Sequence, residues 1–198
     1  VQYFEPAVMS PRTQESAKAN MKIFANFLKN EQSIIENMYY PDPSIVERTL
    51  VIIKPDNWKH ASSKPGTIID MFARTGLRII GCKIQQLSVA QGLEFYGPVK
   101  DVLIEKLSPV FGKKGKEALE DKFDIKLSND SLKMITDSFG VEYAVDQFNQ
   151  IVEFMAGTKP SECPEEDLEK PGKVKSMVII YEGEDAVSKI RDVLGATD

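Results

Sequence analysis

The stretch "ERTLVIIKPDNWKHASSKPGTIIDMFARTGLRIIGCKIQQL", Glu47–Leu87, decides the predicted fold of this 198-residue chain. Its segment "TLVIIK" is β-branched and continuously apolar, as in a strand that is buried on both faces. In the segment that follows, four apolar residues share one face of a predicted helix: Ile68, Ile69, Phe72 and Ala73. Gly76 is a plausible end for this helix. "LRIIGCKIQQL" then alternates like a second strand, so the stretch predicts a strand, a helix and a strand.

The rest of the chain continues this pattern with a long helical part between strands. "SVAQGLEFYGP" predicts a helix that Ser88 caps and that ends at Gly97-Pro98. Residues 100–147 are helical in character, "FNQIVEFMAG" is a further helix, and "VKSMVIIYEG" predicts a third strand. "EDAVSKIRDVLG" is a last helix, which Gly195 ends. This order predicts an α/β (α+β) fold: a ferredoxin-like split βαβ sandwich with an antiparallel sheet and one strand unaccounted for.

The first 46 residues form a predicted helical N-terminal extension. Its apolar residues recur at helical spacing, at Met21, Phe24, Phe27 and Leu28. "YPDPS" then breaks the helix, because each proline restricts itself and the residue before it. We interpret the extension as a docking helix or an oligomer contact, with a specific partner-binding helix as the alternative. The main domain is predicted at 47–198, with insertions at about 100–147 and 158–173.

Composition narrows the class of protein. Hydrophobic residues make up 42% and charged residues 28% of the chain, as in soluble globular proteins. The net charge of −5 argues against a broad nucleic-acid surface. A local basic pocket could still attract phosphates.

The cysteines and the hydropathy pattern predict a cytoplasmic location. Cys82 and Cys163 have neither metal-ligand spacing nor a disulfide framework, which indicates a reducing compartment. Cys82 lies in an apolar alternation and is predicted to be a packed thiol. No run approaches the ~18 apolar residues of a transmembrane helix, and the first residues lack a signal-peptide pattern. We therefore expect no membrane partner.

The candidate binding residues lie at the two ends of the main domain. Lys54 follows a predicted buried strand, a common place to meet a ligand, although a lysine can also merely end a strand. The chain has no Walker A pattern and no G-x-G-x-x-G, so cationic side chains would have to hold any phosphate. In "YEGEDAVSKIRDVLGATD", Arg191 and the hydroxyl of Thr197 could approach one oxyanion.

These segments resemble the nucleoside diphosphate kinases. "ERTLVIIKPD" is similar to the first strand of that family, and "GTIIDMFARTGLRIIGCK" to its first helix and second strand. "MVIIYEGEDAVSKIRDVLGATD" matches the family pattern MV-x-x-x-EG-x-x-AV-x-x-x-R-x-x-x-G-x-T closely. The resemblance covers residues 47–96 and 148–198 in the correct order.

The resemblance implies roles for five residues. Lys54 would hold the outer phosphates, and Tyr96 would lie near the reacting histidine. Arg191 and Thr197 would contact the middle and outer phosphates, and Phe148 or a neighbour would fall near the aromatic that stacks on the base. The resemblance also implies Mg²⁺ held chiefly by the nucleotide phosphates, ATP and nucleoside diphosphates as partners, and assembly into homo-oligomers.

The catalytic signature of the family is absent from these residues. In the family, the reactive histidine and an arginine and asparagine before it follow the position that matches Asp198. His60, the single histidine of the chain, lies in a loop that is longer than in the family and lacks the flanking pattern. We therefore expect His60 to be a bystander.

The resemblance implies a nucleoside diphosphate kinase that transfers the γ-phosphate of a nucleoside triphosphate through a phosphohistidine beyond the end of this chain. The alternative is a catalytically inactive nucleotide-binding or scaffold protein with the same fold. Together, Lys54, Tyr96, Arg191 and Thr197 favour the working site, because a pure scaffold has no physical need for a cationic set. A histidine followed by Ala/Gly-Ser-Asp after Asp198 would distinguish the two.

Overall fold

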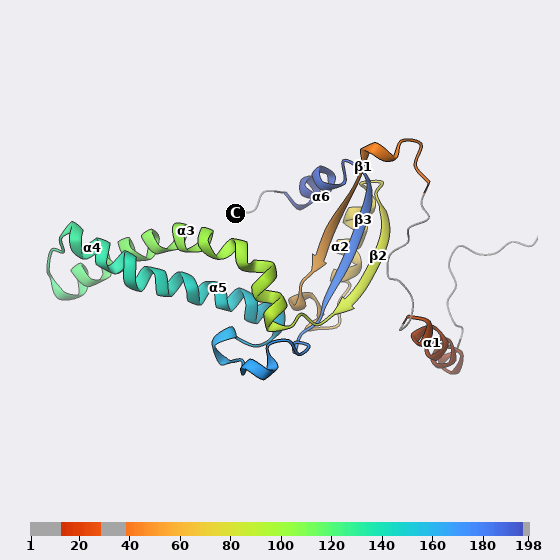
Figure 1. Cartoon of the computed structure of the whole chain (residues 1–198), viewed down its shortest axis with the longest axis horizontal. Helices are drawn as coiled ribbons and strands as arrows, with labels where there is room; N and C mark the ends of the chain where they lie inside the picture. Colours follow the sequence, from red (N-terminus) through yellow and green to blue (C-terminus); the bar gives the residue numbers. More distant parts are fainter. Residues whose placement is uncertain (1–12, 29–38, 196–198) are drawn as a thin grey trace, which may run out of the picture.

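The computed structural model describes residues 13–28 and 39–195. The predicted N-terminal helix is present as α1, Gln14–Leu28, and it lies apart from the sheet (Figure 1). Met21 and Ile23 are 63% and 55% exposed. A docking or partner-binding role for this helix stays a prediction.

The sheet is antiparallel, as predicted. In the described part it has three strands: β1 (Val46–Ile53), β2 (Arg78–Gln85) and β3 (Ser176–Glu184). β3 lies between the other two and is antiparallel to both. This spatial order, β1-β3-β2, is that of a split βαβ sandwich, which confirms the predicted fold class.

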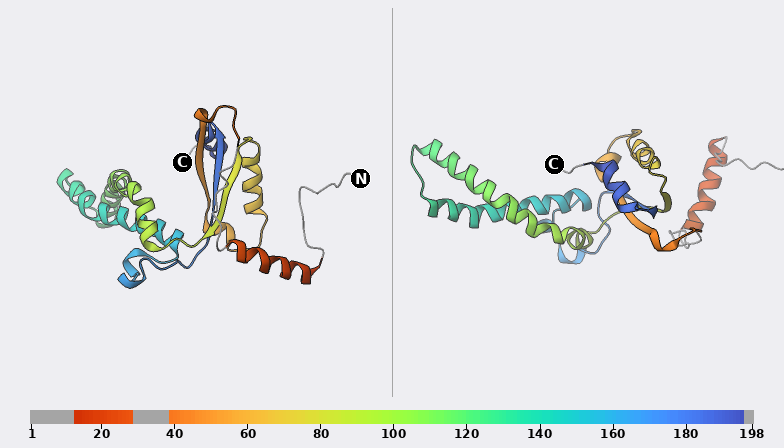
Figure 2. Two further views of the ribbon diagram at one scale, coloured as in Figure 1. Left: turned by 45° about the vertical axis from the view of Figure 1, so that its right-hand side comes forward. Right: turned by 90° about the horizontal axis from the view of Figure 1, so that it is seen from above.

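Two helices cover one face of the sheet, α2 (Lys64–Ala73) and α6 (Ala186–Leu194) (Figure 2). The core between these layers consists of six buried residues: Val51, Ile53, Phe72, Ile179, Tyr181 and Ile190. Ile68 and Ile69 pack against this cluster, as the helical pattern predicts. After α2, Gly76 takes a left-handed φ of 72°, a conformation that is easy only for glycine. We call this part of the molecule the sheet unit.

Three expectations about burial are wrong. β1 is not buried on both faces, since Leu50 is 45% exposed. The cause is that α2 and α6 lie on the opposite face, where Val51 and Ile53 point. Cys82 is exposed rather than packed. Ala73 is also exposed, because α2 ends at this residue and the core lies beside the preceding turns.

Residues 89–156 form a helical hairpin that we call the arm. It contains α3 (Val89–Phe123), α4 (Asn129–Ile135), a π-helical turn (Thr136–Gly140) and α5 (Val141–Ala156). The arm extends sideways from one end of the sheet unit, with α4 at its far tip (Figure 1). At its base a second apolar cluster forms from four buried residues: Val89, Phe148, Val152 and Ala156.

The start of α3 follows the prediction, but its end does not. Ser88 caps the helix and forms a full capping box with Gln91. The predicted stop at Gly97-Pro98 is wrong, because α3 continues through Pro98 and Pro109 to Phe123. Each proline removes one backbone donor, and α3 bends near its beginning in Figure 1. Packing against α5 along the arm stabilises α3 beyond its two prolines.

Two short segments join the arm to the sheet unit. The Gln86 side-chain amide donates to the Gly172 carbonyl at 2.7 Å, and the Lys173 N–H donates to the Ala156 carbonyl at 2.8 Å. The loop before β3 is acidic and contains 3₁₀ turns at Pro160–Glu162 and Glu165–Asp167. None of the helices within the described ranges combines the length and apolar character needed to cross a membrane.

Candidate functional site

Lys54 follows directly after the last residue of β1. Ile53 is 2% exposed and holds this end of the strand in the core of the sheet unit. Pro55 then starts a 3₁₀ turn, Pro55–Trp58, and the Trp58 indole N–H donates to the Ile53 carbonyl at 3.3 Å. The backbone around Lys54 is therefore fixed on both sides. Its side chain is exposed and forms no hydrogen bond or ion pair within the described residues.

Arg191, near the C-terminal end of the domain, also follows a residue of the buried core. It follows Ile190, which is 3% exposed and belongs to the same core cluster as Ile53. The Arg191 guanidinium is exposed, and none of the described residues pairs with it. Two exposed cations thus each follow a residue of one core cluster, although 137 positions separate them in the sequence. Such a pair can bind a multiply charged anion such as a phosphate chain.

Tyr96 and Phe148 lie in the arm. Tyr96 is half-buried at the base of the arm, and burial raises the pKa of its hydroxyl, which stays protonated near neutral pH. Phe148 is 2% exposed, and the Lys100 ammonium lies 5.7 Å from the centre of its ring. This conformation leaves no ring face open for a stacked base. A stacking role for Phe148 stays a prediction that requires its neighbours to move.

The structure therefore places the predicted site residues in two parts of the molecule. Lys54 and Arg191 share the sheet unit, while Tyr96 and Phe148 share the arm, and no extensive contact joins the arm to β1 or α6 in the described part. Thr197 lies outside the described residues. A cleft of about 480 Å³ borders Pro55 and Lys59 on one side and α5 on the other, next to Lys54.

His60 lies two residues after the Pro55–Trp58 turn. Its side chain is exposed and has no hydrogen-bond partner among the residues described. No described hydrogen bond orients the imidazole for attack on phosphorus. The expectation that His60 is a bystander stays a prediction.

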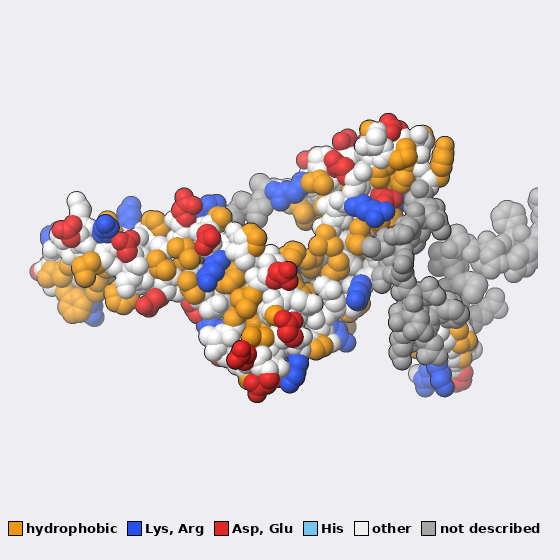
Figure 3. Space-filling model, viewed as in Figure 1, with side chains coloured by type: hydrophobic (Ala, Val, Ile, Leu, Met, Phe, Trp, Pro, Cys, Tyr) orange, Lys and Arg blue, Asp and Glu red, His pale blue; other side chains and the backbone are white. Residues whose placement is uncertain are grey.

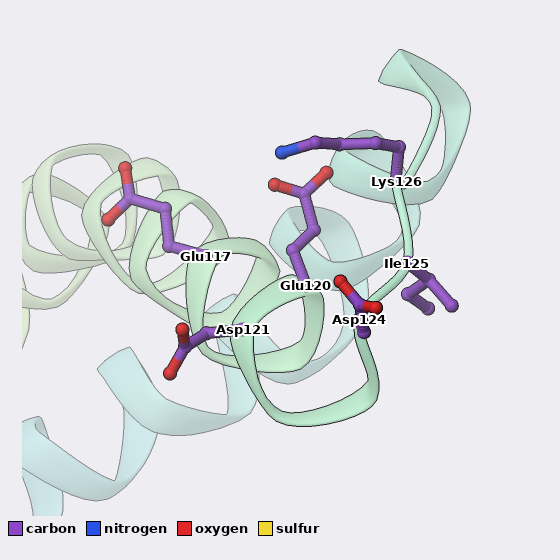
Figure 4. A pocket seen from close by; sticks show the side chains of 6 residues that line it. All are labelled: Glu117, Glu120, Asp121, Asp124, Ile125 and Lys126. Carbon is purple, nitrogen blue, oxygen red and sulfur yellow. The ribbon is translucent and has the colours of Figure 1, made fainter.

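The tip of the arm contains a cleft of about 400 Å³ with a different character (Figure 4). Four carboxylates line it, from Glu117, Glu120, Asp121 and Asp124. The Leu127 backbone N–H donates to Glu120 at 2.8 Å and holds the pKa of that carboxyl below its usual value. The Lys126 side chain extends over the Glu120 carboxylate (Figure 4). An acidic cleft repels phosphates, so it does not compete with Lys54 and Arg191 as a nucleotide site.

An ion pair between the half-exposed Arg48 and the buried Glu182 lies at the opposite end of the sheet from Lys54. The Arg48 Nε donates to the Glu182 carboxylate at 2.7 Å, and the Glu182 side chain is 6% exposed. Burial raises the pKa of Glu182, but hydrogen bonding from Arg48 and the charges of Arg48 and Arg78 outweigh it. The net pKa is lower than the ordinary value. The ionised carboxylate is therefore the form that the fold stabilises.

Replacing Arg48 should cost more stability at neutral pH than in acid. A lowered folded-state pKa contributes stability above the unfolded pKa of about 4.3 and loses it as pH falls through the folded value. We expect Arg48→Ala to lower the free energy of unfolding by about 1.5–3 kcal/mol at pH 7, because Glu182 stays buried without its donor. The difference from the wild type should shrink below about pH 4. Urea unfolding at pH 7 and pH 3.5 measures both; an equal difference at the two values would contradict this account.

Charge elsewhere on the molecule is mixed. Figure 3 shows Lys and Arg side chains interspersed with Asp and Glu over the arm and the sheet unit on this face. Neither sign gathers into a broad patch on the face shown.

Comparison with known proteins finds a similarity to one family over part of the chain. The family model described as "Nucleoside diphosphate kinase" matches residues 47–106, which include β1, Lys54, α2, β2 and the start of α3. A nucleoside diphosphate kinase of Halorhodospira halophila is 29% identical over 153 residues. One of Bordetella petrii is 46% identical over 56 residues. Over residues 47–106 the chain is similar to the nucleoside diphosphate kinases.

The matches cover only part of the length of each relative. The aligned region covers 77% of this chain and 65% of the Halorhodospira nucleoside diphosphate kinase. For the Bordetella protein the shares are 28% and 38%. Among solved structures, an NDP kinase of Pyrobaculum aerophilum is similar at 22% identity, with a TM-score of 0.45, over 77% of this chain and 69% of that one. The Aquifex aeolicus nucleoside diphosphate kinase has a TM-score of 0.39 at 22% identity, over 77% and 65%.

This similarity leaves several expectations as predictions. Binding roles for Lys54, Tyr96, Phe148, Arg191 and Thr197 are among them, as are the domain boundaries. Mg²⁺ binding, assembly into homo-oligomers and a cytoplasmic location also stay predictions.

Proposed function

We propose that Lys54 and Arg191 form the phosphate-binding part of a nucleoside diphosphate kinase. The observation that carries the proposal is the pair of exposed cations, Lys54 and Arg191, each next to a residue of one buried cluster. Rigidly supported cations can align a phosphate chain and neutralise oxygens whose charge is redistributed during transfer. The similarity of residues 47–106 to the nucleoside diphosphate kinase family model supports the same proposal.

The proposed reaction has two steps. A neutral imidazole nitrogen attacks the γ-phosphorus of a nucleoside triphosphate; an N–P bond forms, and the bond to the bridging oxygen breaks, releasing a nucleoside diphosphate. A terminal oxygen of a second nucleoside diphosphate then attacks the phosphohistidine and restores the imidazole. Such covalent splitting gives ping-pong kinetics. The protein contributes mainly alignment and charge stabilisation.

We assign the attacking histidine to a position outside residues 1–198. His60 is exposed and without a hydrogen-bond partner in the described part of the chain, so it has no group to hold its ring in line. The half-buried Tyr96 hydroxyl would act near the reacting nitrogen as a hydrogen-bonding group.

A magnesium ion would come with the nucleotide. Within the described ranges, no three His, Cys, Asp or Glu side chains gather into a group that could hold a metal. Mg²⁺ commonly keeps several waters and binds substrate phosphates. In this proposal phosphate oxygens and water would therefore supply most of its ligands, and the ion would neutralise phosphate charge alongside Lys54 and Arg191.

Labelling of the full-length protein tests the proposal. Incubation with γ-labelled ATP and Mg²⁺ should give labelled protein whose phosphate is lost in acid and stable in base. The His60→Ala variant should be labelled within about twofold of the wild type, since exposed loop substitutions usually change stability by only about 0.5 kcal/mol.

Two outcomes would contradict it. Loss of label in His60→Ala with the fold intact would make His60 the nucleophile. Tight nucleotide binding without any label at millimolar ATP would support the alternative, an inactive nucleotide-binding or scaffold protein.

A further inference from the structure

The helix that carries Arg191 begins without a cap of its own. The residue before α6, Asp185, has a left-handed backbone (φ 52°, ψ 35°), and its side chain caps no N–H of the helix. A helix start leaves several backbone N–H groups without intrahelical partners, and a polar side chain normally accepts from one of them. Here the local sequence does not supply that acceptor.

A residue 140 positions away supplies it instead. The Glu47 carboxylate accepts a hydrogen bond from the Val187 N–H, with 3.1 Å between Oε2 and N. Glu47 is the second residue of β1 and pairs with Gly183 of β3. A carboxylate at a helix start also interacts favourably with the helix dipole. This contact ties the first turn of α6 to β1.

The same strand and the same helix carry the two cations of the proposed site. β1 has Glu47 near its beginning and Lys54 directly after its end. α6 has Val187 in its first turn and Arg191 one turn later, about 6 Å along the axis. Ile190, packed in the core, anchors the far half of the helix. Fixing Val187 on β1 therefore restricts where the Arg191 guanidinium can lie relative to the Lys54 ammonium.

We propose that Glu47 is a positioning residue: its bond to Val187 holds α6 so that Arg191 and Lys54 reach the same phosphate chain. This inference rests on the proposed function. A positioning role differs from a plain contribution to stability. If Glu47 positions α6, nucleotide affinity should fall whenever the hydrogen bond to Val187 is lost, whether or not the unfolding midpoint changes.

Substitutions at Glu47 distinguish a positioning role from a plain contribution to stability. Glu47→Ala removes the acceptor, whereas Glu47→Gln keeps an oxygen that can accept from Val187. Glu184→Ala is the matched control, since this exposed glutamate lies at the same end of the sheet and its side chain makes no described hydrogen bond. Two quantities are measured for each: hydrogen exchange of the Val187 amide, and the Kd for MgADP at a temperature where all variants are folded.

Glu47→Ala should exchange the Val187 amide about fivefold faster and bind MgADP about fivefold more weakly, the effect of losing a helix cap. Glu47→Gln should recover most of both values, and Glu184→Ala should match the wild type. Unchanged Val187 exchange in Glu47→Ala would overturn the inference. So would faster exchange with wild-type affinity for MgADP, or weakening by Glu184→Ala to the same degree.

Failure of the proposed function gives a different result. If the wild-type protein does not bind MgADP at all, the proposed function falls and the positioning role with it. Faster exchange in Glu47→Ala would then show that Glu47 is a helix cap only.

Discussion

Lys54→Ala and Arg191→Ala should each weaken MgADP binding by roughly tenfold to a hundredfold. Each side chain is exposed and makes no described ion pair, so its removal takes nothing from the fold that the structure shows. A charge-assisted hydrogen bond to a phosphate contributes roughly 1.5–3 kcal/mol, which corresponds to that range of affinity. Calorimetric titration of each variant with MgADP measures the loss.

Two other exposed cations serve as controls, one of each type. Lys64 begins α2 and Arg74 follows its end, and neither makes a described ion pair. Lys64→Ala and Arg74→Ala should change the Kd by less than about twofold, because exposed charges that do not touch the ligand are screened by salt. If these controls weaken binding as much as the site variants, general electrostatic attraction rather than direct contact holds the nucleotide. The proposed site would then be wrong.

Gly172→Ala should destabilise the protein strongly. A Cβ at this position would lie 2.1 Å from the Leu87 carbonyl oxygen and 2.4 Å from that of Ala156. Both are backbone atoms, so no side-chain rotation can relieve the clash. Overpacking usually costs about 1–3 kcal/mol, and we expect at least the upper end here, because two connecting segments would have to separate.

Gly97→Ala provides the matched control for this substitution. Gly97 lies inside α3, and a Cβ there would meet nothing within 4 Å. Alanine favours a helix over glycine by about 0.8–1 kcal/mol, so this variant should be slightly more stable than the wild type. Urea unfolding of both variants decides the matter. A Gly172→Ala protein as stable as the wild type would show that the two segments can part without cost.

The pattern of the sequence predicts most of the sheet unit. β-branched runs indicate β1 and β3, and Gly76 and Gly195 follow the ends of α2 and α6 as expected. The open face of β1 could not be predicted, because a continuous apolar run looks the same whether one or two faces are covered. The full length of α3 could not be predicted from the local sequence for a related reason. Gly97-Pro98 is a local stop signal, and distant packing against α5 overrides it.

The candidate site was predicted in part. Lys54 and Arg191 stand out because each interrupts or follows a strongly patterned element. Glu47 is part of the same quoted motif, but its role depends on a hydrogen bond between residues 140 positions apart and on the left-handed backbone of Asp185. Neither feature leaves a signal in the local sequence. The burial of Phe148 is likewise a property of the arm as a whole.

The strand order has a consequence for how the chain is made. β1 and β2 both pair with β3, and neither pairs with the other. During synthesis, the two earlier strands therefore emerge before β3, their partner in the described sheet, because Ser176–Glu184 is translated later. The arm, whose contacts are closer in sequence, can complete its packing in the meantime, because short loops close at a lower entropic cost. Over that interval the nascent chain carries a finished hairpin and two unpaired apolar strands, the state most exposed to aggregation.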